Sequence, residues 1–190
     1  MGTIVVTEFV SLDGVFEDPG GAEGYEYGGW TFEYDRGDEG NTFKLDELMD
    51  AKVQLLGRVT YEGFAEAWPG RTAEDDEGAE FMNNVRKYVL SSTLTEVGWN
   101  NSTLLTGDPA EAVRTLKASP GGDIMTSGSP TAVRWLLSEG LVDELNLLLY
   151  PVVVGRGKRL FPDAGPSFPM ELKKSTAFGN GVVQLTYVPS

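Results

Sequence analysis

Short apolar segments alternate with helix-like segments along most of the chain. Strands are predicted over residues 4–12, 52–57, 87–91, 102–105, 123–126 and 143–154, and helices ending near residue 50 and over 60–68, 109–118 and 131–138. Two last strands, 171–178 and 182–188, flank a Gly-Asn-Gly turn and predict a hairpin. Strands that alternate with helices usually pair in parallel. The sequence therefore predicts an α/β fold: a mainly parallel central sheet with a C-terminal antiparallel hairpin and helices on both faces.

Cysteine and histidine are both absent from the 190 residues. Their absence excludes disulfides, thiolate nucleophiles, cysteine-ligated metal sites and a Ser-His-Asp triad, and we expect no metal site. Acid–base chemistry is left to Asp, Glu, Tyr, Lys or water. The length suits a single domain spanning residues 1–190. The first residues lack the basic and apolar regions of a secretory signal, so a cytoplasmic location is expected.

The acidic charge is concentrated in the first half of the chain. Residues 1–86 hold 6 Lys or Arg and 20 Asp or Glu, which accounts for the whole net charge of −14. Such a field opposes nucleic acid and anionic membranes, so we expect neither as a partner. A phosphate site in this chain must be built locally from backbone N–H groups, helix N-termini and individual arginines.

Three turns follow predicted strands and supply small residues: 57–60 (Gly-Arg-Val-Thr), 91–93 (Ser-Ser-Thr) and 127–130 (Ser-Gly-Ser-Pro). We interpret each as a strand-to-helix turn at the carboxyl edge of the sheet, where α/β proteins bind ligands. A phosphate would approach Gly57 and Gly128 closely and pair with Arg58. The alternative is that the hydroxyl residues only cap helices or shape turns and that Arg58 is a surface cation.

Four segments resemble the dihydrofolate-reductase-like family, and within it proteins related to the reductase domain of the bifunctional riboflavin-biosynthesis deaminase/reductase. They are Ser-Leu-Asp-Gly at 11–14, Leu-Leu-Gly-Arg-Val-Thr-Tyr-Glu-Gly-Phe at 55–64, Val-Leu-Ser-Ser at 89–92, and Gly-Leu-Val-Asp-Glu-Leu at 140–145 with Pro-Val-Val-Val-Gly at 151–155. The resemblance extends over residues 3–187. It implies an NADPH-dependent reductase and a small-molecule substrate, and a homodimer is common among such proteins.

The resemblance also implies which residues contact NADPH. Gly57, Arg58, Val59 and Thr60 would hold phosphates, with Arg58 as the partner of the 2′-phosphate, and Ser91, Ser92 and Thr93 would lie along the adenosine ribose. The pyrophosphate would be bound by Ser127, Gly128, Ser129, Pro130 and Thr131. Asp13 and Gly14 would approach the nicotinamide. Folate reductases proper have two glycines where this chain has Ser127-Gly128. That departure keeps open a second function, a binding module of the same fold without turnover.

Substrate binding is assigned to Asp13, Trp30 and Asp35, and catalysis to the two carboxylates. Asp35 follows Trp30 by five residues, a spacing that imitates the pterin-binding acid of folate reductases inside a long glycine-rich loop expected over residues 15–42. The alternatives are that Asp13 forms the turn before Gly14, that Trp30 packs a lid, and that Asp35 is a solvated carboxylate. The proton that accompanies hydride would come from Asp13, Asp35 or ordered water. Candidate substrates are pterin-like, riboflavin-pathway pyrimidine-like or carbonyl compounds.

Overall fold

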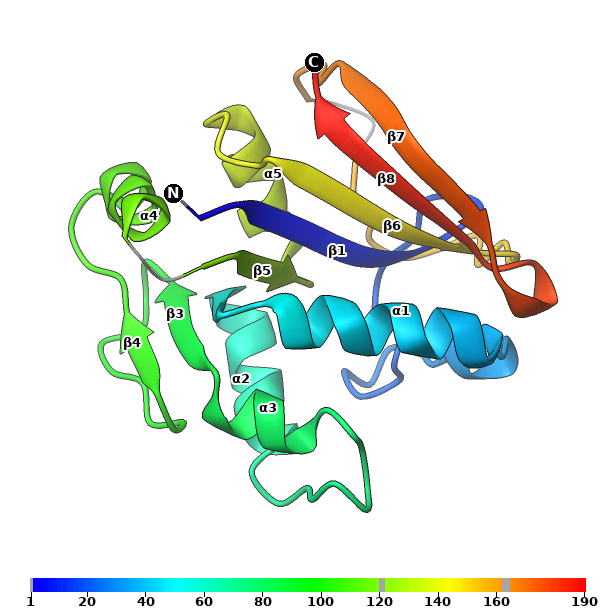
Figure 1. Ribbon diagram of the computed structural model, residues 1–190, viewed down its shortest axis with the longest axis horizontal. Helices are drawn as coiled ribbons and strands as arrows, with labels where there is room; N and C mark the ends of the chain where they lie inside the picture. Colours follow the sequence, from blue (N-terminus) through cyan, green and yellow to red (C-terminus); the bar gives the residue numbers. More distant parts are fainter. Residues whose placement is uncertain (1, 120–121, 162–164) are drawn as a thin grey trace.

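An eight-stranded sheet organises the chain, in a computed structural model that describes residues 2–119, 122–161 and 165–190 (Figure 1). The strands are β1 (Ile4–Ser11), β2 (Val53–Gly57), β3 (Arg86–Leu90), β4 (Ser102–Leu104), β5 (Ile124–Ser127), β6 (Glu144–Tyr150), β7 (Met170–Ala177) and β8 (Val183–Pro189). Their order is β4-β3-β2-β5-β1-β6-β8-β7. The first six are parallel, whereas β8 is antiparallel to β6 and β7 to β8. The predicted parallel sheet with a C-terminal antiparallel hairpin is confirmed.

The helices are α1 (Gly37–Asp50), α2 (Arg58–Ala67), α3 (Ala79–Asn84), α4 (Pro109–Ala118) and α5 (Pro130–Ser138), with 3-10 turns over Trp30–Glu33 and Gly179–Gly181. Helix α4 begins as its sequence predicts, because the Asp108 carboxylate accepts the Glu111 N–H at 2.9 Å and proline follows. Within the described residues, no helix has both the length and the apolar character needed to cross a membrane.

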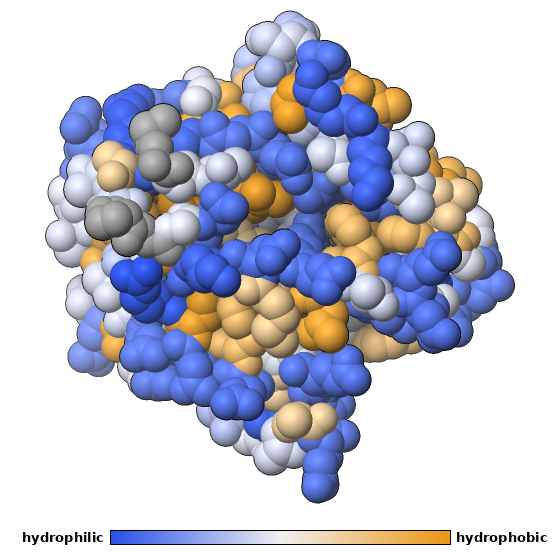
Figure 2. All heavy atoms as spheres, in the orientation of Figure 1, coloured by the Kyte–Doolittle hydropathy of each residue, from blue (hydrophilic) through white to orange (hydrophobic). Residues whose placement is uncertain are grey.

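Helices cover both faces of the sheet, and alternate side chains of β1 show this. Val6 belongs to an apolar core with Val133 and Leu136 of α5. Thr7 points the other way, where its hydroxyl donates to Glu47 of α1 at 2.8 Å. On the face that carries α1, hydrophilic side chains predominate, and apolar ones are visible at the centre and toward the right of the view (Figure 2). The two helical layers therefore enclose the sheet, as expected.

Element boundaries differ from the sequence predictions in several places. Helix α1 begins at Gly37, so the loop expected to reach residue 42 is shorter. Glycines disfavour helices, yet Gly40 is required here, since an added Cβ would lie 2.8 Å from the Arg36 Cβ. Strand β6 stops at Tyr150, before Pro151, rather than at residue 154. Residues 72–77 are exposed as expected, but Ala79 is buried where α3 begins.

Candidate functional site

The start of α2 after β2 and the turn after β5 meet at one edge of the sheet. These strands are parallel neighbours, so both carboxyl ends lie on the same side. The Thr60 Oγ1 and Ser129 Oγ atoms are 2.6 Å apart and share a hydrogen bond. A Cβ added to Gly57 would lie 2.4 Å from the Ser129 Oγ. A side chain at residue 57 would therefore collide with Ser129, which shows that the start of α2 and the β5–α5 turn are in direct contact.

The β5–α5 turn has an unusual backbone. Gly128 and Ser129 both have positive φ, +63° and +55°, before α5 begins at Pro130. A Cβ on Gly128 would lie 2.7 Å from the Thr60 Oγ1. The first N–H groups of a helix lack intrahelical acceptors, and they attract anions together with the helix dipole. This turn, next to Thr131 in the first helical turn, has the chemistry of a phosphate site.

Arg58 and Val59 lie in α2 and not in a turn, which corrects the sequence interpretation. Strand β2 passes directly into the helix, with Gly57 as the N-cap in an extended conformation. The Arg58 guanidinium forms an ion pair with Glu62 one helical turn later, at 2.7 Å, and both side chains are more than two-fifths exposed. Such exposed i,i+4 pairs contribute only about 0.3–0.5 kcal/mol. A bound phosphate can therefore compete with Glu62 for Arg58.

Ser91, Ser92 and Thr93 lie at the same edge, because Leu90 pairs with Gly57 in the sheet. They do not form a strand-to-helix turn as predicted, since an irregular segment leads from β3 directly to β4. The Ser91 hydroxyl accepts the N–H groups of Thr93 and Leu94 at 3.1 and 2.9 Å. Without a helix behind them, these residues offer exposed hydroxyl groups but no helix N-terminus.

Asp13 binds its own loop through both carboxylate oxygens. Oδ1 accepts the Ser11 hydroxyl at 2.6 Å and the Val154 N–H at 3.1 Å, and Oδ2 accepts the Gly155 N–H at 2.9 Å. Burial acts to raise the pKa of Asp13, but these hydrogen bonds outweigh it and lower the pKa. Gly14 follows with φ +79°. Asp13 is therefore held as an anion that joins two loops, which favours the turn-forming alternative.

Trp30 and Asp35 occupy different environments. Trp30 is buried, donates its indole N–H to the Glu17 carbonyl at 3.2 Å, and packs edge-on against Tyr150 with ring centroids 5.5 Å apart. Asp35 is exposed, and its carboxylate accepts the Gly37 N–H at 2.8 Å at the start of α1. Trp30 thus packs a loop onto β6, while Asp35 shapes a helix start. No described contact links Asp35 to the turns at Gly57 and Gly128.

Glu8, a buried acid in β1, is not among the site residues predicted from the sequence. Only 4% of Glu8 is exposed, and among the described residues its Oε1 has no hydrogen-bond partner. Burial raises the pKa of Glu8 well above its ordinary value, and the Glu47 carboxylate raises it further. The Gly128 N–H and the Lys44 ammonium oppose this shift. The available signal was the strand period, which places Glu8 on the same face as Val6 and Val10.

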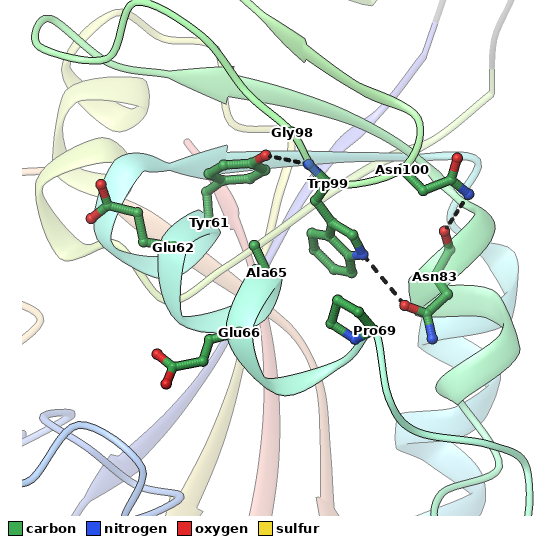
Figure 3. A pocket seen from close by; sticks show the side chains of 9 residues that line it. All are labelled: Tyr61, Glu62, Ala65, Glu66, Pro69, Asn83, Gly98, Trp99 and Asn100. Carbon is green, nitrogen blue, oxygen red and sulfur yellow. Dashed lines mark hydrogen bonds between the residues drawn. The ribbon is translucent and has the colours of Figure 1, made fainter.

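An open groove of about 810 Å³ lies between α2 and the segment that contains Trp99 (Figure 3). Tyr61 and Trp99 line it, with the Trp99 N–H donating to the Tyr61 hydroxyl at 3.0 Å and the Trp99 indole N–H to the Asn83 amide oxygen at 3.3 Å. Glu62 and Glu66 add acidic side chains to its wall. None of the predicted site residues lines this groove, and its carboxylates would oppose a phosphorylated ligand.

Comparisons with known proteins agree with this fold. The uncharacterized protein YyaP of Bacillus subtilis (strain 168) is 31% identical over 144 residues, which cover 75% of this chain and 76% of YyaP. A putative riboflavin biosynthesis protein from Shewanella sp. PV-4 superposes with a TM-score of 0.77 at 21% identity, covering 99% of both chains. A dihydrofolate reductase from Enterococcus faecalis, complexed with NADP(H), superposes with a TM-score of 0.61 at 15% identity, covering 100% of this chain and 97% of that one.

At these identities the two structures establish the fold alone, which is that of dihydrofolate reductases and of riboflavin-biosynthesis reductase domains. The family model of the RibD C-terminal domain matches residues 2–184, almost the whole chain. That match agrees with the resemblance carried by residues 11–14, 55–64, 89–92 and 140–155. The chain therefore belongs to the RibD C-terminal domain family.

Proposed function

We propose that this protein is an NADPH-dependent reductase that transfers hydride to a small heterocyclic or carbonyl compound, such as a pterin-like or riboflavin-pathway pyrimidine-like molecule. The observation that carries the proposal is the contact between the start of α2 and the β5–α5 turn, closed by the Thr60–Ser129 hydrogen bond of 2.6 Å. Family membership supports a reductase-type fold.

The residues at this junction fit a phosphorylated dinucleotide. Gly57 and Gly128 have no side chains, which lets Ser129 and Thr60 bring the two segments together, and the α5 N-terminus supplies N–H groups for a phosphate. Arg58, at the first position of α2, would bind the 2′-phosphate in exchange for Glu62. Ser91, Ser92 and Thr93 would line the ribose. Since all of these groups are local, they can bind phosphate despite the acidic charge of the chain.

The cofactor supplies the hydride when it is bound, and the chain supplies position and a proton path. Asp13 and Gly14 follow β1, the strand that pairs with β5. The hydrogen bonds that keep Asp13 ionised make it a poor proton donor, and Asp35 is exposed and engaged with Gly37. We therefore assign the substrate's proton to ordered water.

NADPH titration tests the proposal, with tryptophan quenching and thermal stabilisation as readouts. Arg58→Ala should weaken NADPH binding about ten- to hundredfold and NADH binding far less, because a charge-assisted bond to the 2′-phosphate contributes about 1.5–3 kcal/mol. Glu62→Ala, which frees Arg58 from its ion pair, should leave NADPH binding intact or tighter. Arg71→Ala is the matched control, since Arg71 lies over the Trp68 ring beyond the other end of α2.

Absence of NADPH binding would reject the reductase proposal. Equal losses for NADPH and NADH in Arg58→Ala would reject only the 2′-phosphate assignment.

A second candidate is a binding module of the same fold that holds the dinucleotide without turnover. The engagement of both Asp13 oxygens and the exposure of Asp35 favour it, because neither predicted catalytic carboxylate is poised to give up a proton. NADPH binding without oxidation across pterins, ribityl pyrimidines and simple carbonyls would support this module. Oxidation of NADPH with any of them would support the reductase.

We also propose that the protein forms a homodimer, as its resemblance to the family implies. Light scattering of the purified protein tests it, and a monomeric mass at micromolar concentration would reject it. A cytoplasmic location is consistent with a cofactor that cells keep in that compartment, and fractionation of cells producing the tagged protein tests it.

A further inference from the structure

The groove between α2 and the segment that contains Trp99 has two walls of opposite character (Figure 3). Glu62 and Glu66, one helical turn apart, lie along one side, and the Trp99 ring lies with Pro69 along the other. Ala65 lies between the two walls, and its small side chain leaves the floor open. The volume of about 810 Å³ is typical of small-molecule sites. A ligand in this groove would meet an acidic wall and an apolar wall at the same time.

The chain itself neutralises little of the acidic wall. Among the residues that the structure describes, Glu66 forms no ion pair, and Glu62 forms one, with Arg58 at 2.7 Å. Both members of that pair are exposed, so the pair is weak and open to exchange. Lys87 lies 4.0 Å from the centroid of the Trp99 ring, but it is fully buried and donates to backbone carbonyl groups, so it is not a partner for either glutamate. Two carboxylates are therefore available to a ligand.

The opposite wall has few free hydrogen-bond donors. The Trp99 indole donates to Asn83 at 3.3 Å, the Asn83 amide to the Trp68 carbonyl at 3.0 Å, and the Asn100 amide to the Asn83 carbonyl at 2.9 Å. Within the described residues, the Asn100 amide oxygen accepts no hydrogen bond, so it adds an acceptor to those of the two glutamates. A ligand that brings its own donors matches this lining.

We propose that this groove binds an amphipathic organic cation, an arylalkylammonium compound whose ammonium group pairs with the two glutamates and whose ring packs against the apolar wall. Charge complementarity selects this occupant, because an anion is repelled by the acidic wall and by the net charge of −14. Exposed ion pairs contribute little singly, so the ring supplies most of the affinity and the ammonium group supplies the selectivity.

Glu62 connects the groove to the proposed cofactor site. The carboxylate that lines the groove is also the ion-pair partner of Arg58, the residue proposed to bind the 2′-phosphate. An ammonium group paired with Glu62 would release Arg58 for the cofactor. This coupling, unlike the groove itself, rests on the reductase function proposed above. Because an exposed pair one helical turn apart is weak, a filled groove should tighten NADPH binding only about twofold, and NADPH should tighten binding in the groove by the same factor.

Isothermal titration calorimetry with four related probes tests the groove in the absence of NADPH. Phenethylamine carries both the ring and the ammonium group, phenethyl alcohol only the ring, ethylamine only the ammonium group, and hydrocinnamate a ring with a carboxylate. Phenethylamine should bind at least about fivefold more tightly than each of the others, and added salt should weaken it.

Glu66→Gln keeps the shape of the side chain, removes one charge and leaves the Arg58–Glu62 pair in place. It should weaken phenethylamine binding about threefold, and Glu62→Gln should do the same. Glu80→Gln is the matched control, because Glu80 is an exposed acid of α3 that does not line the groove, and it should leave the affinity unchanged. For the coupling, NADPH is titrated with and without saturating phenethylamine. The twofold gain expected in wild type should be absent in Glu62→Gln.

Equal affinities for phenethylamine and phenethyl alcohol overturn the groove proposal, as does unchanged phenethylamine binding in both glutamate variants. These measurements contain no NADPH, so either result leaves the reductase proposal standing. An NADPH affinity that phenethylamine does not change removes the coupling through Glu62. A wild type that binds phenethylamine but not NADPH rejects the reductase and the coupling together, and it supports the groove as a cation site.

Discussion

The contact between Gly57 and Ser129 makes Gly57→Ala a quantitative test of the two-turn junction. Alanine suits the backbone at residue 57, where φ is −75° and ψ is 159°, so the substitution causes no dihedral strain. The obstacle is space. The new Cβ would lie 2.4 Å from the Ser129 Oγ and 2.7 Å from the Ser129 Cβ, whereas Ala132 is at an ordinary 3.5 Å. Ser129 alone therefore determines the cost.

Opposing effects set the magnitude of that cost. Overpacking of this kind costs about 1–3 kcal/mol, and replacing glycine by alanine returns about 0.4–1 kcal/mol by restricting the unfolded chain. The net loss of unfolding free energy should be about 1–2 kcal/mol, or roughly 2–8 °C in melting temperature for a chain of this size. Ser129→Gly removes both obstructing atoms. By itself it should be nearly neutral, since about 1 kcal/mol of left-handed strain is relieved and a hydrogen bond of similar value is lost.

A double-mutant cycle measured by urea unfolding isolates the contact. In the Ser129→Gly background, Gly57→Ala should cost less than about 0.5 kcal/mol. Ser129→Ala is the intermediate control, because it removes the Oγ but keeps the Cβ at 2.7 Å, and it should relieve only part of the cost. Equal destabilisation by Gly57→Ala in all three backgrounds would show that the two turns are not in contact and would refute the description of the junction.

Asp13→Asn should lower the unfolding free energy by about 1.5–3 kcal/mol at pH 7. The pKa of Asp13 is lowered in the folded state, so the ionised carboxylate stabilises the fold above the ordinary carboxyl pKa, and this stabilisation is lost as pH falls through the pKa of the folded protein. A difference in unfolding free energy between Asp13→Asn and wild type that persists at pH 2 would contradict the prediction. Lys87 is fully buried, and burial lowers its pKa to about 8. Above that pH the unfolded chain binds more protons than the folded chain, so the unfolding free energy of wild type should rise by roughly 2 kcal/mol from pH 8 to 10. Lys87→Met should lack this rise, and parallel pH profiles of the two proteins would argue against it. Gly140→Ala should cost about 1 kcal/mol, because Gly140 has a φ of +63° and open space around it, whereas Gly128→Ala, with the same φ, should cost more because its Cβ also meets Thr60. Only Gly128→Ala should weaken NADPH binding, and equal binding by both variants would separate this turn from the cofactor.

The sheet was predictable because its strands are short, apolar and separated by turn residues. Strand β2, for example, is buried at every position and ends at Gly57, so burial and punctuation both appear in the sequence. Helix α1 was only half predicted, since its first turns contain Gly37 and Gly40 and lack an apolar face. Tertiary contacts hold that helix, because Lys44 and Glu47 of α1 both form hydrogen bonds with Thr7 of β1, at 2.9 and 2.8 Å. Local patterns do not contain this information.

The candidate site, like the fold, could be predicted from the sequence only in part. Gly57 and Gly128 were predicted because glycine after a strand is a local signal, and the structure adds the reason that a Cβ at either position would collide with Ser129 or Thr60. The helical placement of Arg58 was missed because a strand passing directly into a helix leaves no turn residues to mark the boundary. Glu8 was missed because a single acid in an apolar strand has the same appearance at an edge, at a surface or in a core. Only the register of β1 with β5 places it behind Gly128.

A net charge of −14 and a site for a phosphorylated cofactor are compatible if the groups nearest the phosphates are neutral. The β5–α5 turn meets this condition with N–H and hydroxyl groups, which bind anions without contributing to the net charge. Arg58 is already neutralised by Glu62 and becomes available only by exchange. Hydrogen bonds from such neutral groups to a phosphate are stronger where the site excludes water, whereas the repulsion by distant exposed carboxylates is screened by salt, so a locally neutral turn can bind an anion in an acidic chain.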